Sequence, residues 1–217
     1  MAKFGIVVPV YNHSDLLGRC LSSILGQTFQ DFNVYCIKDD KGGPKKVETV
    51  FREKGGKKFD YTKLKFYADF KHKGLPKRLN ESFDYVKDDY WGYFGADDIM
   101  ISNALENLKN LDKDWCYGGY IDSYGYSYTP PRFNRKLLTK NNYIPGGSVF
   151  IRTEIVKKLK FNEDMNFGGE DEDMWKRLVN LSVFRTPTPQ YIYVLGRSNF
   201  DKKGFNKRYE PLDTVLK

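Results

Sequence analysis

Apolar residues in the first half of the chain gather in short blocks, and amphipathic stretches separate these blocks. Compact apolar blocks predict four buried β-strands, at residues 4–10, 32–37, 64–68 and from 91 onward. Apolar positions at helical spacing, with Gly and Pro as breaks, predict the helices between them, at residues 14–25, 45–54 and 75–86. Strands that alternate with helices in this way predict right-handed crossovers, a largely parallel sheet and therefore an α/β fold.

The second half of the chain has a less regular pattern. Helices are expected at residues 102–111 and 170–181 and in the segment that ends at Leu159, and strands at 144–152 and 190–195. Residues 115–128 are rich in Tyr and Gly, which suits twisted strands or a loop that lines a substrate. We predict one α/β domain at residues 1–195, followed by a basic and aromatic C-terminal tail or lid at residues 196–217.

A chain of 217 residues is long enough to bury a core without disulfide bonds. It has no apolar run of the length needed to cross a bilayer, and its N-terminus lacks a signal-peptide pattern. Cys20, Cys36 and Cys116 are odd in number and have no paired spacing, which indicates reduced thiols. We therefore expect a cytoplasmic protein, either free or peripheral to a membrane; a viral chain would act in the host cytoplasm.

The net charge is positive and unevenly distributed. The chain carries 36 Lys or Arg against 28 Asp or Glu, a formal charge of +8. Residues 38–78 hold 14 of the basic and 6 of the acidic side chains, so this segment accounts for the whole surplus. The surplus favours an anionic partner such as a nucleotide or a nucleic acid, and a solvated lysine-rich face explains it equally well.

Two adjacent carboxylates, Asp97 and Asp98, follow the aromatic strand that begins at Trp91. The carboxyl ends of strands form the edge at which open α/β sheets bind ligands. Two neighbouring carboxylates repel each other unless a cation lies beside them, and hard divalent ions prefer such oxygen ligands. The alternative is a simple turn in which Asp98 caps a following helix.

A second acidic cluster begins the helix expected at residues 170–181. Asp171 shares one helical face with Met174, Trp175 and Leu178, so we expect this face to be buried and Asp171 to lie at the rim of a cleft. A partly desolvated carboxylate has a raised proton affinity, as a general base requires. Acidic residues also favour helix N-termini for their dipole, but that preference does not explain an acid on the apolar face.

The chain resembles the family 2 glycosyltransferases of the GT-A fold in an ordered set of short motifs. The likeness runs from Phe4 to about Leu181 and rests on Val8-Pro9-Val10-Tyr11-Asn12, Lys38-Asp39-Asp40, Ala96-Asp97-Asp98 and Gly169-Glu170-Asp171. The resemblance implies a GT-A domain with a nucleotide-binding half at about residues 1–98 and an acceptor-side half at about 99–195. It further implies a nucleotide-sugar donor that lies across the carboxyl ends of the parallel strands.

The resemblance also assigns the donor-binding residues. It implies that Pro9, Tyr11 and Asp39 hold the nucleobase and ribose, with Asp39 accepting a hydrogen bond from the base. The segment Gly74–Asn80 resembles the family's glycine, basic residue and asparagine segment but departs from it in spacing, and it implies Arg78 as a nucleotide contact. Uridine donors are the commonest in the family, so a UDP-sugar is favoured.

The resemblance assigns the reaction as well. Asp97 and Asp98 would hold Mn²⁺ or Mg²⁺ against the diphosphate, and Asp171 would be the catalytic base of an inverting transfer. The family's aspartate-x-aspartate motif usually begins with an acid, whereas this chain has Gly95 there. Metal binding through Asp97 and Asp98 is retained on this interpretation, at a weaker or more open site.

The acceptor and two other functional classes remain open from the sequence. The family favours a growing glycan or a lipid-linked sugar as acceptor, while the basic segment and the tail also suit hydroxymethylated DNA, as in some phage-encoded enzymes. A nucleotidyltransferase usually has a glycine-rich phosphate loop near its first strand, and Tyr11-Asn12-His13 is not such a loop. Gly95 also keeps open a non-catalytic relative that binds a nucleotide or a nucleic acid without turnover.

Overall fold

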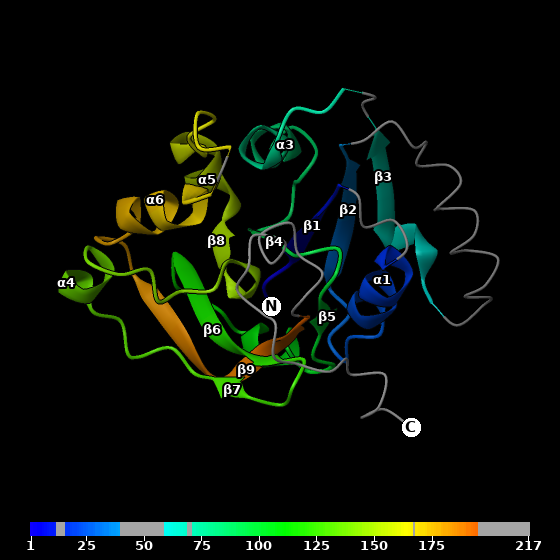
Figure 1. The fold of residues 1–217 in the computed structure, drawn as a ribbon. Helices are drawn as coiled ribbons and strands as arrows, with labels where there is room; N and C mark the ends of the chain where they lie inside the picture. Colours follow the sequence, from blue (N-terminus) through cyan, green and yellow to red (C-terminus); the bar gives the residue numbers. More distant parts are fainter. Residues whose placement is uncertain (12–15, 40–58, 69–70, 167, 195–217) are drawn as a thin grey trace.

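The computed structural model describes residues 1–11, 16–39, 59–68, 71–166 and 168–194. These residues form one mixed β-sheet with helices packed against both of its faces (Figure 1). The strand order is β3-β2-β1-β4-β8-β6-β9-β5, and β7 pairs with β6. Predictions for Ser14, for a helix at 45–54 and for the tail at 196–217 lie outside the described residues.

The first half forms the parallel part of the sheet. Its elements are β1 (Phe4–Val10), α1 (Leu17–Leu25), β2 (Phe32–Lys38), η2 (Tyr61–Lys63), β3 (Leu64–Ala68), α3 (Leu75–Ser82) and β4 (Tyr90–Tyr93). Strand β1 pairs in parallel with both β2 and β4, and β2 pairs in parallel with β3. The four predicted strands and their parallel arrangement are confirmed. Helix α3 ends four residues earlier than expected, because the chain continues as turns after Ser82.

The second half adds antiparallel pairs. Its elements are β5 (Ile99–Met100), η3 (Glu106–Leu108), β6 (Trp115–Asp122), β7 (Ser127–Tyr128), α4 (Arg135–Leu138), η4 (Gly146–Ser148), β8 (Phe150–Arg152), α5 (Thr153–Leu159), α6 (Glu170–Arg177) and β9 (Val183–Tyr193). The helix predicted at 102–111 is wrong, since only a short 3₁₀ turn forms within it. Strand β9 begins earlier than predicted. Its residue Pro189 lies where the register with β6 shifts, because proline cannot donate a backbone hydrogen bond within a regular strand pair.

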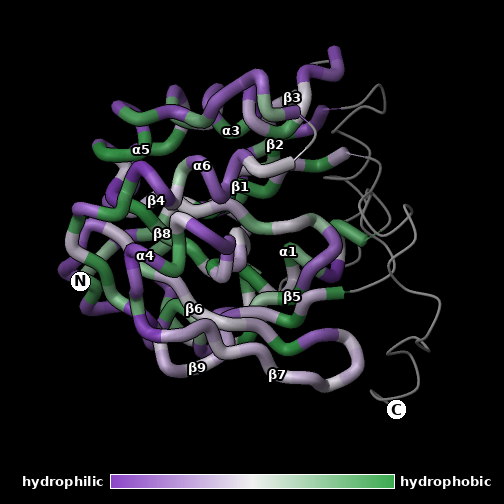
Figure 2. Tube along the Cα trace, turned by 60° about the vertical axis from the view of Figure 1, so that its left-hand side comes forward, coloured by the Kyte–Doolittle hydropathy of each residue, from purple (hydrophilic) through white to green (hydrophobic). Residues whose placement is uncertain are grey.

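The core lies on both faces of the sheet. Alternate residues of β1 divide between them, so that Ile6 and Val8 face the cluster under α1 while Val7 faces the cluster under α3, α5 and α6. The second cluster contains the buried side chains of Trp91 and Trp175. Figure 2 shows hydrophobic segments mainly inside the fold and hydrophilic ones along the outer turns.

The sheet topology brings the carboxyl ends of distant strands to one edge. Strand β8 runs antiparallel to both β4 and β6, and β6 runs parallel to β9, so β4, β6 and β9 point the same way as β1 and β2. Asp39 follows β2 and Asp97 follows β4 at this edge. None of the described helices is long and apolar enough to cross a membrane.

Candidate active site

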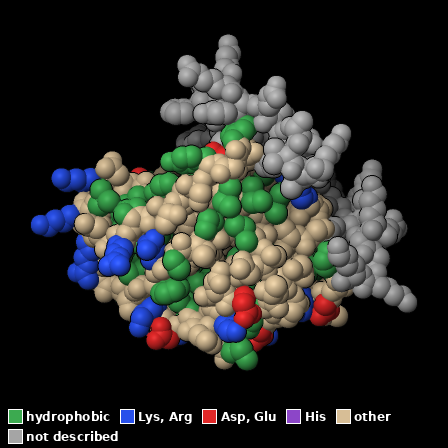
Figure 3. Space-filling view, turned by 90° about the horizontal axis from the view of Figure 1, so that it is seen from below, with side chains coloured by type: hydrophobic (Ala, Val, Ile, Leu, Met, Phe, Trp, Pro, Cys, Tyr) green, Lys and Arg blue, Asp and Glu red, His purple; other side chains and the backbone are tan. Residues whose placement is uncertain are grey.

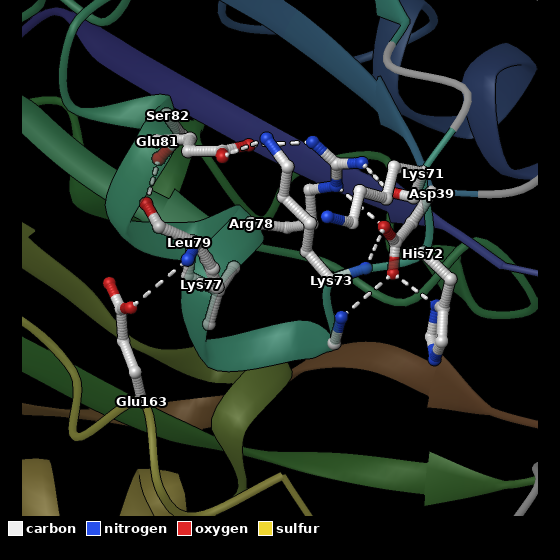
Figure 4. A network of polar contacts seen from close by, with 11 residues as sticks. Asp39, Lys71, His72, Lys73, Lys77, Arg78, Leu79, Glu81, Ser82 and Glu163 are labelled. Carbon is white, nitrogen blue, oxygen red and sulfur yellow. Dashed lines mark hydrogen bonds and ion pairs between the residues drawn. The ribbon is translucent and has the colours of Figure 1, made fainter.

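Asp39 is the centre of a buried polar network at the end of β2 (Figure 4). Its Oδ1 atom accepts hydrogen bonds from the backbone N–H of Lys73 at 2.8 Å and from Nε of Arg78 at 2.6 Å. Its Oδ2 atom accepts from the backbone N–H of Gly74 at 3.1 Å and lies 2.7 Å from Nδ1 of His72. The carboxylate of Asp39 is therefore contacted by four nitrogen atoms. Of the residues that supply them through a side chain, Arg78 is buried and His72 is exposed.

Arg78 is buried beside Asp39 despite its charge. Its Nη1 atom bonds to Glu81 at 2.6 Å, and its Nη2 atom donates to the backbone carbonyl of Lys71. Burial lowers the pKa of the Arg78 guanidinium, but its bonds to Asp39 and Glu81 outweigh burial and leave the pKa raised. All three guanidinium nitrogens are engaged by the protein, so the geometry supports Arg78 as the residue that orients Asp39.

Tyr11 lies at the same edge, directly after β1. Its ring stacks on the ring of His72, with centroids 4.3 Å apart and an interplanar angle of 21°. The side chain of Pro9, two residues earlier in β1, is half-buried. The structure thus places Tyr11 and Asp39 on either side of His72, which contacts both and which no sequence motif indicated.

Asp97 and Asp98 lie in the turn after β4. Asp98 is buried, and its Oδ1 atom accepts a hydrogen bond from the backbone N–H of Val194 at 3.1 Å. Burial raises the pKa of Asp98 well above its usual range, and the neighbouring charge of Asp97 adds to this rise. The alternative in which Asp98 caps a helix is wrong, because strand β5 follows it directly.

Asp171 reaches the same edge from the first turn of α6. Gly168 and Gly169 precede the helix with φ values of 111° and 89°, a conformation that residues with a side chain rarely adopt. The predicted apolar face is confirmed, since Met174, Trp175 and Leu178 are fully buried. These contacts fix the helix and hold the half-buried side chain of Asp171 at its rim.

The carboxylate of Asp171 is partly desolvated. Its Oδ1 atom accepts from the backbone N–H of Glu172 at 2.6 Å, and its Oδ2 atom accepts from Nδ2 of Asn142 at 3.3 Å. Burial raises the pKa of Asp171, although both hydrogen bonds oppose the rise. Burial also raises the pKa of the adjacent Glu170. Asn142 lies in a loop about 30 residues earlier, and no sequence pattern could have paired it with Asp171.

Comparison with known families identifies the fold and its motifs. The family model described as Glycosyl transferase family 2 matches residues 5–175, which is most of the chain. The chain belongs to glycosyl transferase family 2. The family match therefore confirms the resemblance drawn from the ordered motifs.

Relatives of this family 2 chain are distant in sequence and close in fold. An uncharacterised glycosyltransferase of Methanocaldococcus jannaschii is 24% identical over 189 residues, which cover 80% of the chain and 63% of the relative. The crystal structure of S. aureus TarS 1–349 in complex with UDP-GlcNAc has a TM-score of 0.69 at 17% identity, covering 98% of the chain and 61% of TarS. The mannosyltransferase PcManGT of Pyrobaculum calidifontis, in complex with GDP-Man and Mn²⁺, has a TM-score of 0.67 at 13% identity, covering 92% and 59%. The chain thus spans about three fifths of the length of each relative.

The family's aspartate-x-aspartate motif is changed at Gly95, and the structure gives a physical reason. A Cβ atom at position 95 would lie 2.9 Å from Oδ1 of Asp97 and 2.8 Å from Oδ2 of Asp98. Both carboxylates therefore lie above Gly95 and occupy the space that a side chain at this position would fill. Such convergent oxygens suit Mg²⁺ or Mn²⁺, which proteins often bind through one or two carboxylates together with substrate phosphates and water. No cluster of three or more His, Cys, Asp or Glu in the described residues could hold a metal by itself.

Two tyrosines from different strands lie against the Gly146-Gly147 pair of η4. A Cβ atom at Gly146 would lie 2.1 Å from the hydroxyl oxygen of Tyr93 and 3.6 Å from Oδ2 of Asp171. A Cβ atom at Gly147 would lie 3.2 Å from the ring of Tyr191. Both glycines belong to the short 3₁₀ turn η4 (Gly146–Ser148). In the structure they make room for the two tyrosines.

Proposed function

We propose that this family 2 chain is a metal-dependent, inverting glycosyltransferase that moves a sugar from a UDP-sugar to a hydroxyl group of a glycan or lipid-linked sugar. One observation carries the proposal. At one edge of the sheet, a partly desolvated carboxylate, Asp171, accompanies a convergent carboxylate pair, Asp97 and Asp98. A transfer of this kind needs a base at one side of the reacting carbon and charge neutralisation at the other.

Asp171 is suited to hold the proton of the incoming hydroxyl group. In a single displacement, the acceptor oxygen bonds to the anomeric carbon while the bond from that carbon to the diphosphate oxygen breaks. The hydroxyl proton passes to Asp171, and the nucleoside diphosphate leaves with the bonding electrons. Attack on the face opposite the diphosphate inverts the anomeric configuration. The raised pKa of Asp171 matches this role, because a base is most effective when its pKa approaches the working pH.

Asp97 and Asp98 would hold the Mn²⁺ or Mg²⁺ ion of the family. When bound, such an ion acts as a Lewis acid that offsets the charge developing on the leaving diphosphate. Asp98 is anchored to the end of β9 through Val194, and the guanidinium of Arg19 donates to the backbone carbonyl of Asp97 at 3.1 Å. These bonds fix the turn, so the two carboxylates stay convergent over Gly95.

The nucleotide would lie over the ends of β1 and β2. Tyr11 offers an aromatic face and Pro9 an apolar one, and the position on Asp39 Oδ2 that His72 contacts is the acceptor proposed for an N–H of the base. Arg78 bonds to the Asp39 carboxylate, and Glu81 bonds to Arg78 in turn. The UDP-GlcNAc complex of TarS supports a uridine donor, and the GDP-Man and Mn²⁺ complex of PcManGT supports a divalent ion.

The described part of one face of the molecule favours a glycan acceptor over DNA. Figure 3, seen from below, shows hydrophobic side chains spread among neutral surface, with Lys and Arg gathered toward one rim of the described part of this face. A nucleic acid acceptor is expected to need a basic track along its backbone. We propose a glycan acceptor and treat stimulation by hydroxymethylated DNA as an outcome of the test.

The test measures donor turnover and product stereochemistry together. UDP-, GDP-, dTDP- and CDP-sugars are incubated with Mn²⁺ and with a glycan, a lipid-linked sugar or hydroxymethylated DNA. We expect UDP-sugar turnover with inversion in the wild type and a loss of about 100-fold or more in Asp171→Asn and in Asp97→Ala. Turnover that survives Asp171→Asn would remove Asp171 as the base. Turnover with retention would contradict the single displacement.

A further inference from the structure

The hydroxyl group of Tyr93 points toward the proposed catalytic base. Tyr93 is the last residue of β4, and its ring packs at angles against Trp91 and Phe161, with centroids 5.9 Å and 6.3 Å away. Its hydroxyl oxygen and Oδ2 of Asp171 both lie close to the same point above Gly146. No hydrogen bond joins them directly, but they are near enough for one substrate hydroxyl group to contact both.

Tyr191 lies beside this position from a different strand. Its ring rests against Gly147 and packs edge-on against Phe94 at a centroid distance of 5.7 Å. Charges on both Asp98 and Asp171 act on its phenol, so Tyr191 lies within electrostatic reach of both acidic groups. Besides burial, the charges of Asp171 and Asp98 also raise the pKa of the Tyr93 phenol. The two phenols therefore lie on neighbouring glycines of η4, Tyr93 close to the proposed base and Tyr191 against Phe94, in the segment that leads to Asp97.

Neither tyrosine hydroxyl has a hydrogen-bond partner among the described residues. Fully buried polar atoms without a partner do occur in the described part of the chain, but the hydroxyls of Tyr93 and Tyr191 are not among them. Burial raises the pKa of each phenol well above its usual range, and the nearby carboxylates add to the rise. Both groups therefore stay neutral and can donate a hydrogen bond at physiological pH.

We propose that the hydroxyls of Tyr93 and Tyr191 bind ring hydroxyl groups of the transferred sugar and so determine which sugar the protein accepts. This inference rests on the proposed function and deepens it. The reacting carbon must lie between the leaving diphosphate at Asp97 and the incoming hydroxyl at Asp171, and the charges of Asp98 and Asp171 act on both phenols. A neutral phenol hydroxyl suits an uncharged sugar, because it can donate a hydrogen bond to a sugar hydroxyl oxygen at little desolvation cost.

Removing one phenol hydroxyl should weaken sugar recognition while leaving nucleotide recognition intact. Calorimetric titrations with Mg²⁺ would compare UDP, UDP-glucose, UDP-galactose and UDP-GlcNAc on the wild type, Tyr93→Phe and Tyr191→Phe. We expect UDP affinity to stay within about twofold and affinity for the preferred UDP-sugar to fall by about three- to tenfold in each variant, as for one neutral hydrogen bond. The preference between UDP-glucose and UDP-galactose, which differ at one hydroxyl, should also narrow.

Tyr126→Phe is the matched control, because it makes the same change on a residue that is 68% exposed in the β6–β7 turn. Its affinities should equal those of the wild type. Phe variants that bind UDP-sugars as tightly as the wild type would overturn this inference and leave the proposed transfer standing. Equal losses for UDP and UDP-sugars would indicate a structural role and would also overturn it. A wild type that binds UDP-sugars no better than an unrelated protein would reject the proposed function together with this inference.

Discussion

Replacing Asp39 with Asn should destabilise the buried polar network at the carboxyl end of β2. The side chains of Asp39 and Arg78 are 5% and 2% exposed, and their closest atoms are 2.6 Å apart. Asn has the same shape but no charge, and it presents an N–H group where the protein already supplies donors. If that N–H turns toward His72, whose ring nitrogen can accept, the backbone N–H of Gly74 is left without its partner.

The expected cost follows from the burial of the partner that remains. Removing one member of a buried ion pair costs about 3–5 kcal/mol, because the other charge stays buried and uncompensated. Glu81 still pairs with Arg78 at 2.6 Å, which places the loss near the lower limit, about 3 kcal/mol. For a urea dependence of about 2 kcal/mol per molar, the unfolding midpoint should fall by about 1.5 M.

Urea unfolding followed by tryptophan fluorescence measures this loss, and a double-mutant cycle with Arg78→Met tests its cause. The combined variant should lose less stability than the sum of the single losses, because it no longer buries an unpaired guanidinium. Asp112→Asn is the control: its side chain is 76% exposed beside Lys113, and its effect should stay within about 0.5 kcal/mol. A loss below about 1 kcal/mol at Asp39, or strict additivity in the cycle, would refute the reasoning.

Four further predictions concern the site itself. Because burial raises the pKa of Asp171, the transfer rate should fall on acidification at a higher pH than for an exposed carboxylate, as a pH–rate profile would show. Because the folded-state pKa of Asp171 is raised, its contribution to stability is complete below the unfolded-state pKa and is lost as the pH rises through the folded-state pKa. Inactive Asp171→Asn should therefore unfold at a higher urea concentration than the wild type at pH 7; a lower midpoint would contradict this. Gly95→Asp restores the family's usual acid but puts its Cβ 2.8 Å and 2.9 Å from two carboxylate oxygens. Thermal or urea unfolding should therefore show a loss of about 1–3 kcal/mol in stability, and UDP binding should depend less on Mn²⁺. A stronger dependence of UDP binding on Mn²⁺ would disprove the steric crowding at position 95. His72→Ala should bind UDP several-fold more tightly by calorimetry, since it frees one face of Tyr11 and one acceptor position on the Asp39 carboxylate, whereas weaker binding would mean that His72 contacts the base.

Much of the fold could be predicted because its strands are buried on both faces. A continuous apolar block such as 4–10 has few alternatives to a central strand, and β1 has the predicted bounds. The apolar face of α6 was equally predictable, since Met174, Trp175 and Leu178 recur at helical spacing and share this face with Asp171. Predictions failed where local pattern was weak: residues 102–111 form mostly turns, and the proline-containing start of β9 was missed.

The amino-acid sequence alone therefore determined the first four strands and their parallel arrangement, the positions of Asp39, Asp97 and Asp171 at strand or helix ends, and the family to which they belong. Only the tertiary structure decided which partners these groups meet. It set His72 on Asp39, turned both carboxylates over Gly95, and brought Tyr93 and Tyr191 from distant strands to the glycines of η4. Hydrophobic periodicity is a local property that a sequence displays directly, whereas contacts between polar side chains depend on sheet register and on space left by missing Cβ atoms, which no local pattern records.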